Sequence, residues 1–170
     1  MTTESVAPET LHVWAICMQA AEEARRRGDR RYGTDHLLLA LFEDPSIEAV
    51  LGVSLPQARR TLDSLDHEAL DSLGLGSGAD APDLSMRAVP KTPRIRDVAQ
   101  RDHLRITPAA KKVLENASKP NRRRIQVTAQ QVLAEILTLQ SPDPAAALLG
   151  ALGVTTSEVQ RRLDAATPDT

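Results

Sequence analysis

Three adjacent residues, Thr34, Asp35 and His36, place a hydroxyl, a carboxylate and an imidazole at the start of an apolar run that extends to Phe42. A helical metal site needs a second ligand four residues from the histidine, and positions 32 and 40 are tyrosine and alanine. Nucleophilic catalysis needs a serine or cysteine paired with a base, which the triplet itself does not contain. Threonine and aspartate are also typical of a helix start. We therefore interpret Thr34 as a helix cap, and we expect His36 to pack or to hydrogen-bond locally.

Two further patterns raise the possibility of nucleic-acid binding. Arginine triplets occupy residues 25–27 and 122–124, and the segment LGVTTSEVQRRL (152–163) has the turn and polar helix of a helix-turn-helix fragment. Cations are equally favourable at helix C-termini, where both triplets are predicted to lie. The turn-helix pattern recurs at residues 51–62, so packing between repeats explains both copies. The net charge of −2 gives no general basic field, and we expect no nucleic-acid binding. A helix-turn-helix regulator is kept as the alternative function.

A third candidate lies in residues 103–115. Thr107 followed by Pro108 predicts a capped helix start, and Lys111 and Glu115 are four residues apart on one face of that helix. His103 precedes the cap and could fold over it. The segment would bring backbone N–H groups, a hydroxyl and an ion pair together. A capped surface helix explains the same residues without a ligand, and the sequence leaves both interpretations open.

Helices must position these residues. Of the 170 residues, 41% are hydrophobic and only 2% are aromatic, so the core must consist of Leu, Ala, Val and Ile, which favours close helix packing. Caps, apolar spacing and Gly or Pro breaks predict where the helices lie. The predicted helices run from a Thr10 cap to Arg27, over 34–42, over 46–51, from near Ser54 to about 65, from a Thr107 cap to about 119, over 129–139, over 144–151 and over 156–165.

The chain contains an internal duplication. LGVSLPQARRTLD (51–63) matches LGVTTSEVQRRLD (152–164), and upstream Thr34 aligns with Thr128. Each half then contains a helix, a helix, a short helix and a helix. The predicted fold is all-α, with two pseudo-twofold repeats of a four-helix unit packed as one domain and joined by a long loop. We predict a tail over 1–9, a first repeat over 10–66, a linker over 67–103, a second repeat over 104–165 and a tail over 166–170.

The remaining sequence features indicate the cellular compartment in which we expect the protein to work. The single cysteine, Cys17, cannot form an internal disulfide, which fits a reducing compartment. No signal peptide and no apolar run long enough to span a membrane occurs. We expect a cytoplasmic monomer that needs no cofactor or metal. An enzyme that uses His36 or His103 has the least support.

The duplicated unit, with YGTDHLLLAL (32–41) in one half and ITPAAKKVLE (106–115) opening the other, resembles the Clp N-terminal (Clp repeat) domain. The version in actinobacterial ClpC is the most similar. The resemblance implies a domain without catalytic activity that binds substrates and adaptor proteins for an ATPase ring. In some members it recognises phosphoarginine, and an acidic residue in each half meets the guanidinium. Asp35 matches that residue in the first half, whereas Ala129 replaces it in the second.

The resemblance also implies a groove that binds cyclic peptide antibiotics of the cyclomarin type. The residues that fall on this groove are His103, Ile106, Thr107, Lys111, Glu115, Cys17, Met18, Ala21 and Val6. The chain has no G-x-x-x-x-G-K-[ST] phosphate loop, so it carries no motor of that kind. We expect a protein- or peptide-binding module that acts as a decoy or regulator of the ClpC protease system. A second possibility is an N-terminal fragment of a full ClpC chaperone.

Overall fold

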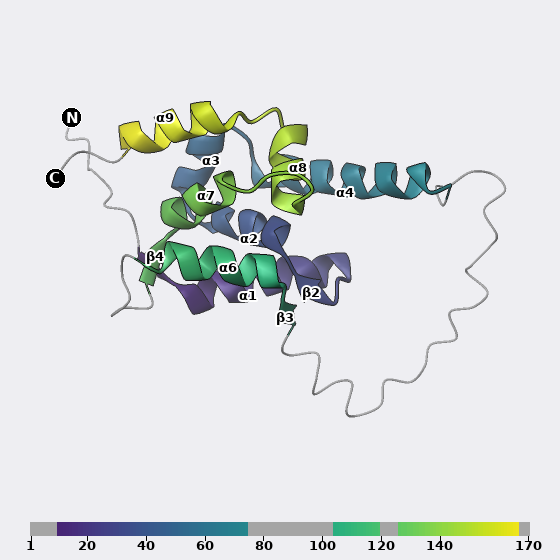
Figure 1. Ribbon diagram of the computed structural model, residues 1–170, viewed down its shortest axis with the longest axis horizontal. Helices are drawn as coiled ribbons and strands as arrows, with labels where there is room; N and C mark the ends of the chain where they lie inside the picture. Colours follow the sequence, from purple (N-terminus) through teal and green to yellow (C-terminus); the bar gives the residue numbers. More distant parts are fainter. Residues whose placement is uncertain (1–9, 75–103, 120–125, 167–170) are drawn as a thin grey trace, which may run out of the picture.

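A computed structural model describes residues 10–74, 104–119 and 126–166, and within these ranges the chain forms a body of packed helices with two short strand pairs (Figure 1). Val6, His103 and the arginine triplet 122–124 lie outside the described residues. The elements of the first half are β1 (Thr10–His12), α1 (Val13–Arg27), β2 (Arg31–Tyr32), α2 (Thr34–Ala40), the 3-10 helix η1 (Leu41–Glu43), α3 (Pro45–Leu51) and α4 (Leu55–Ser72). The elements of the second half are β3 (Arg105–Ile106), α6 (Pro108–Ala117), β4 (Gln126–Thr128), α7 (Ala129–Leu137), α8 (Pro144–Ala151) and α9 (Thr156–Ala166).

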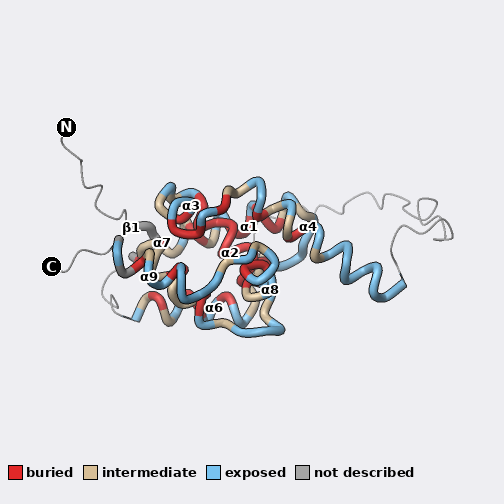
Figure 2. The backbone as a smooth tube through the Cα atoms, turned by 90° about the horizontal axis from the view of Figure 1, so that it is seen from above, coloured by how far each residue is buried: buried red, intermediate tan, exposed pale blue. Residues whose placement is uncertain are grey.

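Helix α2 is the centre of the body. Every residue from Thr34 to Phe42 is buried, and Leu37 and Leu38 have no exposed surface. Helices α1, α6, α7 and α8 all pack against α2, so it is covered on all sides (Figure 2). A helix that is apolar all round belongs inside a protein, which explains the unbroken run LLLALF. The prediction of an all-α fold, with the helices in the expected order, is confirmed.

The predicted caps form at several helix starts. Thr107 and Thr128 accept backbone N–H groups of the first turns of α6 and α7, and Gln131 completes a capping box by accepting the N–H of Thr128. Asp44 and Asp143 cap α3 and α8 in the same way, and proline follows each of them. Local sequence therefore determines where these helices begin.

Two predicted caps were wrong. Thr10 does not cap α1, because residues 10–12 form β1, which pairs antiparallel with β4. Thr34 lies inside the first turn of α2, and Gly33 occupies the cap position. The Thr34 hydroxyl instead donates to Oδ1 of Asp143, 2.7 Å away, in the other half of the chain. In both cases a contact with a distant segment replaces the local one.

The strand pairs join the two halves of the chain. β1 pairs with β4, and β2 pairs in parallel with β3, so that Arg31 lies beside Arg105 and Tyr32 beside Ile106. The N–H of Thr107 then donates to the carbonyl of Tyr32 at 3.0 Å. These short pairs were not predicted from the sequence, because strands of two or three residues leave no readable alternation.

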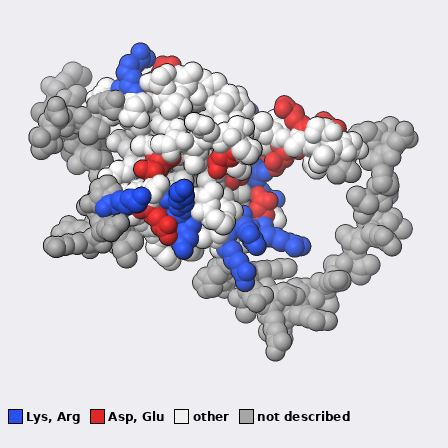
Figure 3. Space-filling model, viewed as in Figure 1, with Lys and Arg blue, Asp and Glu red and all other residues white. Residues whose placement is uncertain are grey.

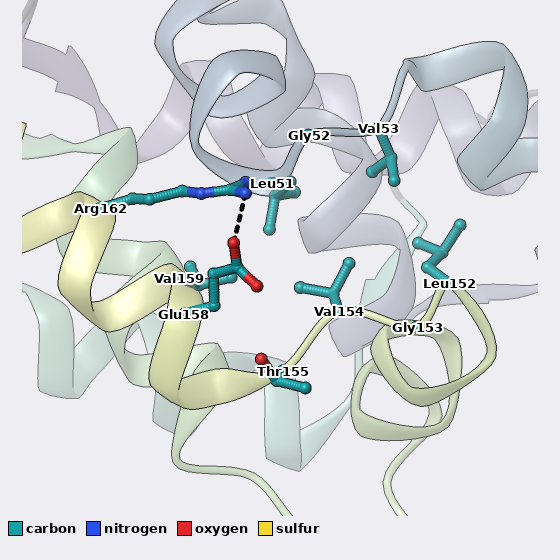
Figure 4. A pocket seen from close by; sticks show the side chains of 10 residues that line it. All are labelled: Leu51, Gly52, Val53, Leu152, Gly153, Val154, Thr155, Glu158, Val159 and Arg162. Atoms are coloured by element: carbon teal, nitrogen blue, oxygen red, sulfur yellow. Dashed lines mark hydrogen bonds and ion pairs between the residues drawn. The ribbon is translucent and has the colours of Figure 1, made fainter.

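The duplicated turns meet where the halves pack. Gly52 and Gly153 both have φ of 70°, a left-handed conformation that favours glycine, and they line one small cavity (Figure 4). Arg162 donates to the carbonyl of Val50 at 2.9 Å and forms an ion pair with Glu158 at 2.6 Å. A packing contact therefore occupies one of the arginines that a helix-turn-helix would present to DNA. The pseudo-twofold relation itself stays a prediction.

Helix α4 continues to Ser72, past residue 67, where the linker was predicted to begin, and its far end projects from the body (Figure 1). Its inner part is held to α1 by ion pairs. Glu23 is 8% exposed and accepts hydrogen bonds from Arg59 and from Arg26. No helix in the described ranges is long and apolar enough to cross a membrane.

Candidate functional site

A cleft of about 460 Å³ opens beside the start of α2, between segments from both halves of the chain. Strand β2, the first turns of α2, α6 and α8, the end of α1 and the middle of α4 surround it. Its wall mixes acidic and basic side chains, and it contains no serine or cysteine among the described residues. The lining residues are Arg27, Asp29, Arg31, Gly33, Thr34, Asp35, His36, Leu62, Asp66, Thr107, Ala109, Asp143 and Pro144.

Asp35 is a buried carboxylate in the wall of this cleft, and only 9% of its surface is exposed. Its Oδ1 lies 3.1 Å from Nδ1 of His36. A Cβ atom at position 33 would lie 2.6 Å from the same oxygen, so Gly33 leaves the space that the carboxylate occupies. No lysine or arginine of the described chain pairs with Asp35. A buried carboxylate without a cationic partner is unusual, because desolvation penalises an isolated charge.

Two opposing effects set the charge of Asp35. Burial by itself raises the pKa of the carboxyl group. Hydrogen bonds from His36 and from backbone N–H groups, together with the positive charge of His36 when it is protonated, outweigh burial and hold the pKa below its ordinary value of 3.8. Asp35 is therefore ionised at neutral pH and attracts cations into the cleft.

The imidazole ring of His36 is buried next to Asp35 and contacts two further groups. The ring is 3% exposed, its Nε2 lies 3.1 Å from Oδ2 of Asp29, and its Nδ1 lies 3.2 Å from the N–H of Gly33. Nδ1 accepts the N–H of Gly33 only when it carries no proton, and it donates to Asp35 only when it does. Nδ1 lies within hydrogen-bond distance of both groups. The expectation that His36 bonds locally is confirmed.

The two arginines that line the cleft, Arg27 and Arg31, differ in how far they are buried and in their ion pairs. Arg27 has a side chain that is only 10% exposed, and it pairs with Asp29, Asp63 and Asp66. It therefore ties α1 to α4 and cannot easily bind a ligand. Arg31 is exposed and lines the cleft. The arginine triplet at the end of α1 is paired with carboxylates, as expected for cations in a last helical turn.

At the aligned helix start of the second half, the described residues include no carboxylate in the place of Asp35. Ala129 aligns with Asp35, is completely buried and carries no charge. The helix start there is closed by the reciprocal bonds between Thr128 and Gln131, at 3.0 and 3.1 Å. A guanidinium would find no carboxylate at this position. The carboxylate that lines the cleft at this helix start thus comes from the first half alone among the two aligned positions.

The groove residues of α1 and α6 are partly brought together. The side chain of Cys17 contacts Tyr32, whose pKa is raised chiefly by burial and further by the thiol of Cys17. Tyr32 in turn pairs with Ile106, and its carbonyl accepts the N–H of Thr107. Cys17, Ile106 and Thr107 therefore meet around Tyr32. Thr107 also lines the Asp35 cleft, so the two candidate surfaces adjoin.

The other predicted groove residues differ in exposure. Met18 is 40% exposed, whereas Ala21 is buried and presents little surface to a ligand. Lys111 and Glu115 form an exposed ion pair at 3.6 Å. The sequence reasoning missed Trp14, which lies one turn before Met18 and is 70% exposed. An indole on a helix surface is a signal of ligand or partner contact that the sequence did contain.

The cleft lining is rich in charged groups. Among the described residues, no group of three or more His, Cys, Asp or Glu side chains is arranged to hold a metal ion. Buried Asp35 and exposed Arg31 face the same space, so the cleft can hold a ligand that carries both signs of charge.

Comparison with known proteins agrees with this architecture. Residues 9–138 match the family model described as the Clp repeat (R) N-terminal domain. No curated protein matches the chain. The matched range contains the whole cleft lining except Asp143 and Pro144. Because the match covers most of the 170 residues, the chain belongs to the Clp repeat (R) N-terminal domain family.

Proposed function

We propose that this protein is a non-catalytic binding module that takes phosphoarginine-type side chains of other proteins at Asp35 and acts as a decoy or regulator of a ClpC-type protease system. The observation that carries the proposal is Asp35 itself. It is a buried, ionised carboxylate without a lysine or arginine partner in the described chain, and it faces a 460 Å³ cleft. A guanidinium would supply the missing partner through paired N–H donors.

The family supports the second part of the proposal. A substrate-binding domain that holds a modified side chain without unfolding the protein competes with the ClpC ring for that protein. The same domain would act as a sponge for cyclic peptides on the adjoining surface of α1 and α6. Exposed Trp14 and Met18 support such a surface, because large apolar side chains contribute most to peptide interfaces.

Calorimetric titration with acetyl-phosphoarginine amide tests the Asp35 site. Asp35→Asn preserves the volume of the side chain and removes its charge, so it should weaken binding by about tenfold to a hundredfold, the worth of one charge-assisted contact. Glu115→Gln, on the exposed face of α6, is the matched control and should leave phosphoarginine affinity unchanged.

A cyclomarin-type peptide should show the opposite dependence. Glu115→Gln should weaken its binding, and Asp35→Asn should not, because the two side chains lie on adjoining but different surfaces. Absence of heat with phosphoarginine would contradict the proposed Asp35 site. Equal losses from both variants with both ligands would show that neither residue acts at a separate site.

A further inference from the structure

The outer end of α4, residues 67–72 with the cap residue Leu73, carries an apolar stripe past the body of the protein. Apolar residues recur along one side of the helix at spacings of three or four residues: Leu62, Leu65, Ala69 and Leu73. Leu62 is buried and Leu65 packs partly against the core, whereas Leu70 and Leu73 are 46% and 72% exposed. Figure 2 shows the outer turns of α4 as exposed. The stripe that holds the inner part of α4 to the body is thus left uncovered by the described residues farther out.

The same part of the chain is acidic. Residues 61–74 contain four carboxylates and no lysine or arginine. Two of the carboxylates pair with Arg27 near the body. The other two, Glu68 and Asp71, are exposed and have no ion pair among the residues that the structure describes. Figure 3 shows red side chains along the part of α4 that projects in Figure 1. The outer end of α4 therefore presents leucines and unpaired carboxylates together.

The charge of this surface decides which partner it fits. A second copy of the chain would bring the same carboxylates to the contact, and like charges brought together oppose association. A helix that carries lysines or arginines beside apolar side chains would pair with Glu68 and Asp71 while it covers Leu70 and Leu73. Charge complementarity therefore favours a basic partner over a second copy.

We propose that the outer end of α4 is a docking surface for a basic amphipathic helix of another protein. The two exposed leucines supply the apolar area that the partner covers, and the two unpaired carboxylates select its charge. None of these four side chains lines the cleft that contains Asp35. The docking surface is therefore separate from the cleft, and the proposal does not depend on which ligand the cleft binds.

Fluorescence anisotropy with a labelled amphipathic peptide of sequence LKKLLKLLKKLLKL tests the docking surface. The natural chain should bind this peptide. The double variant L70S/L73S should weaken binding about tenfold to a hundredfold, because two leucines no longer bury apolar surface in the complex. Both side chains are exposed in the free protein, so the variant should fold, which circular dichroism and thermal unfolding check.

The carboxylates are tested separately. The double variant E68Q/D71N should weaken peptide binding about threefold to tenfold in low salt and have much less effect in about 1 M salt, where exposed charges are screened. The matched control E22Q/E48Q removes two exposed carboxylates from α1 and α3, changes the net charge equally and should leave affinity unchanged. This pair of variants tests the surface even if L70S/L73S fails to fold.

Several results would overturn the proposal. If the natural chain does not bind the peptide, or if E68Q/D71N and E22Q/E48Q weaken binding equally, the outer end of α4 is not a specific basic-helix surface. Concentration-dependent dimerisation in analytical ultracentrifugation that L70S/L73S abolishes would make a second copy the occupant. Peptide binding that begins only when the lysine and arginines of residues 87–96 are replaced by glutamine would make that segment of the chain itself the occupant.

Discussion

Substitution of Gly33 by alanine should weaken ligand binding at the cleft with almost no effect on stability. The backbone at Gly33 has φ of −109° and ψ of −168°, an extended conformation that alanine adopts without strain. The added Cβ would lie 2.6 Å from Oδ1 of Asp35, and its next neighbours are 3.8 and 3.9 Å away. Only the carboxylate oxygen must therefore move, by about 0.8 Å, to restore an ordinary contact.

The expected change in the free energy of unfolding is small because two effects offset each other. Turning the Asp35 side chain away from its rotamer costs about 0.5–1.5 kcal/mol. Replacing glycine by alanine at a compatible position stabilises by about 0.4–1 kcal/mol, since the unfolded chain loses freedom. The net change should lie within about 1 kcal/mol of zero, which urea denaturation resolves.

The expected change in affinity is much larger. A displaced carboxylate loses its contact with the guanidinium of the ligand, a charge-assisted interaction of about 1.5–3 kcal/mol. Calorimetric titration with acetyl-phosphoarginine amide should therefore show a loss of about tenfold to a hundredfold. The charge of Asp35 is kept, so the variant tests its position alone.

Gly28→Ala is the matched control. Gly28 has φ of 81°, and a Cβ there would meet nothing within 4 Å. Alanine should therefore cost about 1–2 kcal/mol of stability through backbone strain and leave affinity unchanged. The reasoning is refuted if Gly33→Ala binds the ligand as well as the natural chain, or if both variants lose affinity in proportion to stability.

Two further predictions concern stability. Thr34→Val removes the hydroxyl that donates to Asp143 and should cost about 1–3 kcal/mol, and a double-mutant cycle with Asp143→Ala should give a coupling of at least about 1 kcal/mol; additive effects would contradict the link. Burial raises the pKa of Glu23, but hydrogen bonds and charges from Arg59 and Arg26 outweigh it and hold the pKa below its ordinary 4.5. Its stabilisation is present above pH 4.5 and is lost as the pH falls through the lowered pKa, so melting temperature should fall more steeply below pH 4.5 in the natural chain than in Glu23→Gln. Parallel curves would show that this network does not set the acid sensitivity.

Local signals explain how much of the fold could be predicted. Thr107 with Pro108, and Thr128 with Gln131, mark helix starts through side chains and backbone groups within one turn, so the sequence contains the whole interaction. The glycine at position 52 likewise marks a left-handed helix end by itself. The helix order and the all-α class follow from such signals.

The errors arise where a distant partner competes with the local one. Thr34 has the right chemistry to cap α2, but its hydroxyl reaches an aspartate 109 residues away. The β2–β3 pair joins segments more than 70 residues apart, and neither segment alternates long enough to indicate a strand. The sequence could thus nominate Asp35 but not the arginines that lie beside its cleft.

The two halves differ at one aligned position, where the first has Asp35 and the second has Ala129, and this difference bears on how tightly one site must bind. In a duplicated domain with two acidic sites, each site can be weak, because a ligand with two modified side chains gains from binding both. Position 129 is a buried alanine here, so the proposed site at Asp35 would have to bind its ligand without a matching carboxylate there. The cleft is nevertheless built from both halves of the chain, since Asp35 belongs to the first half and Thr107 and Asp143 belong to the second. The site beside Asp35 thus depends on the packing of the two halves against each other, and a change that loosens this packing should reduce affinity before it unfolds either half.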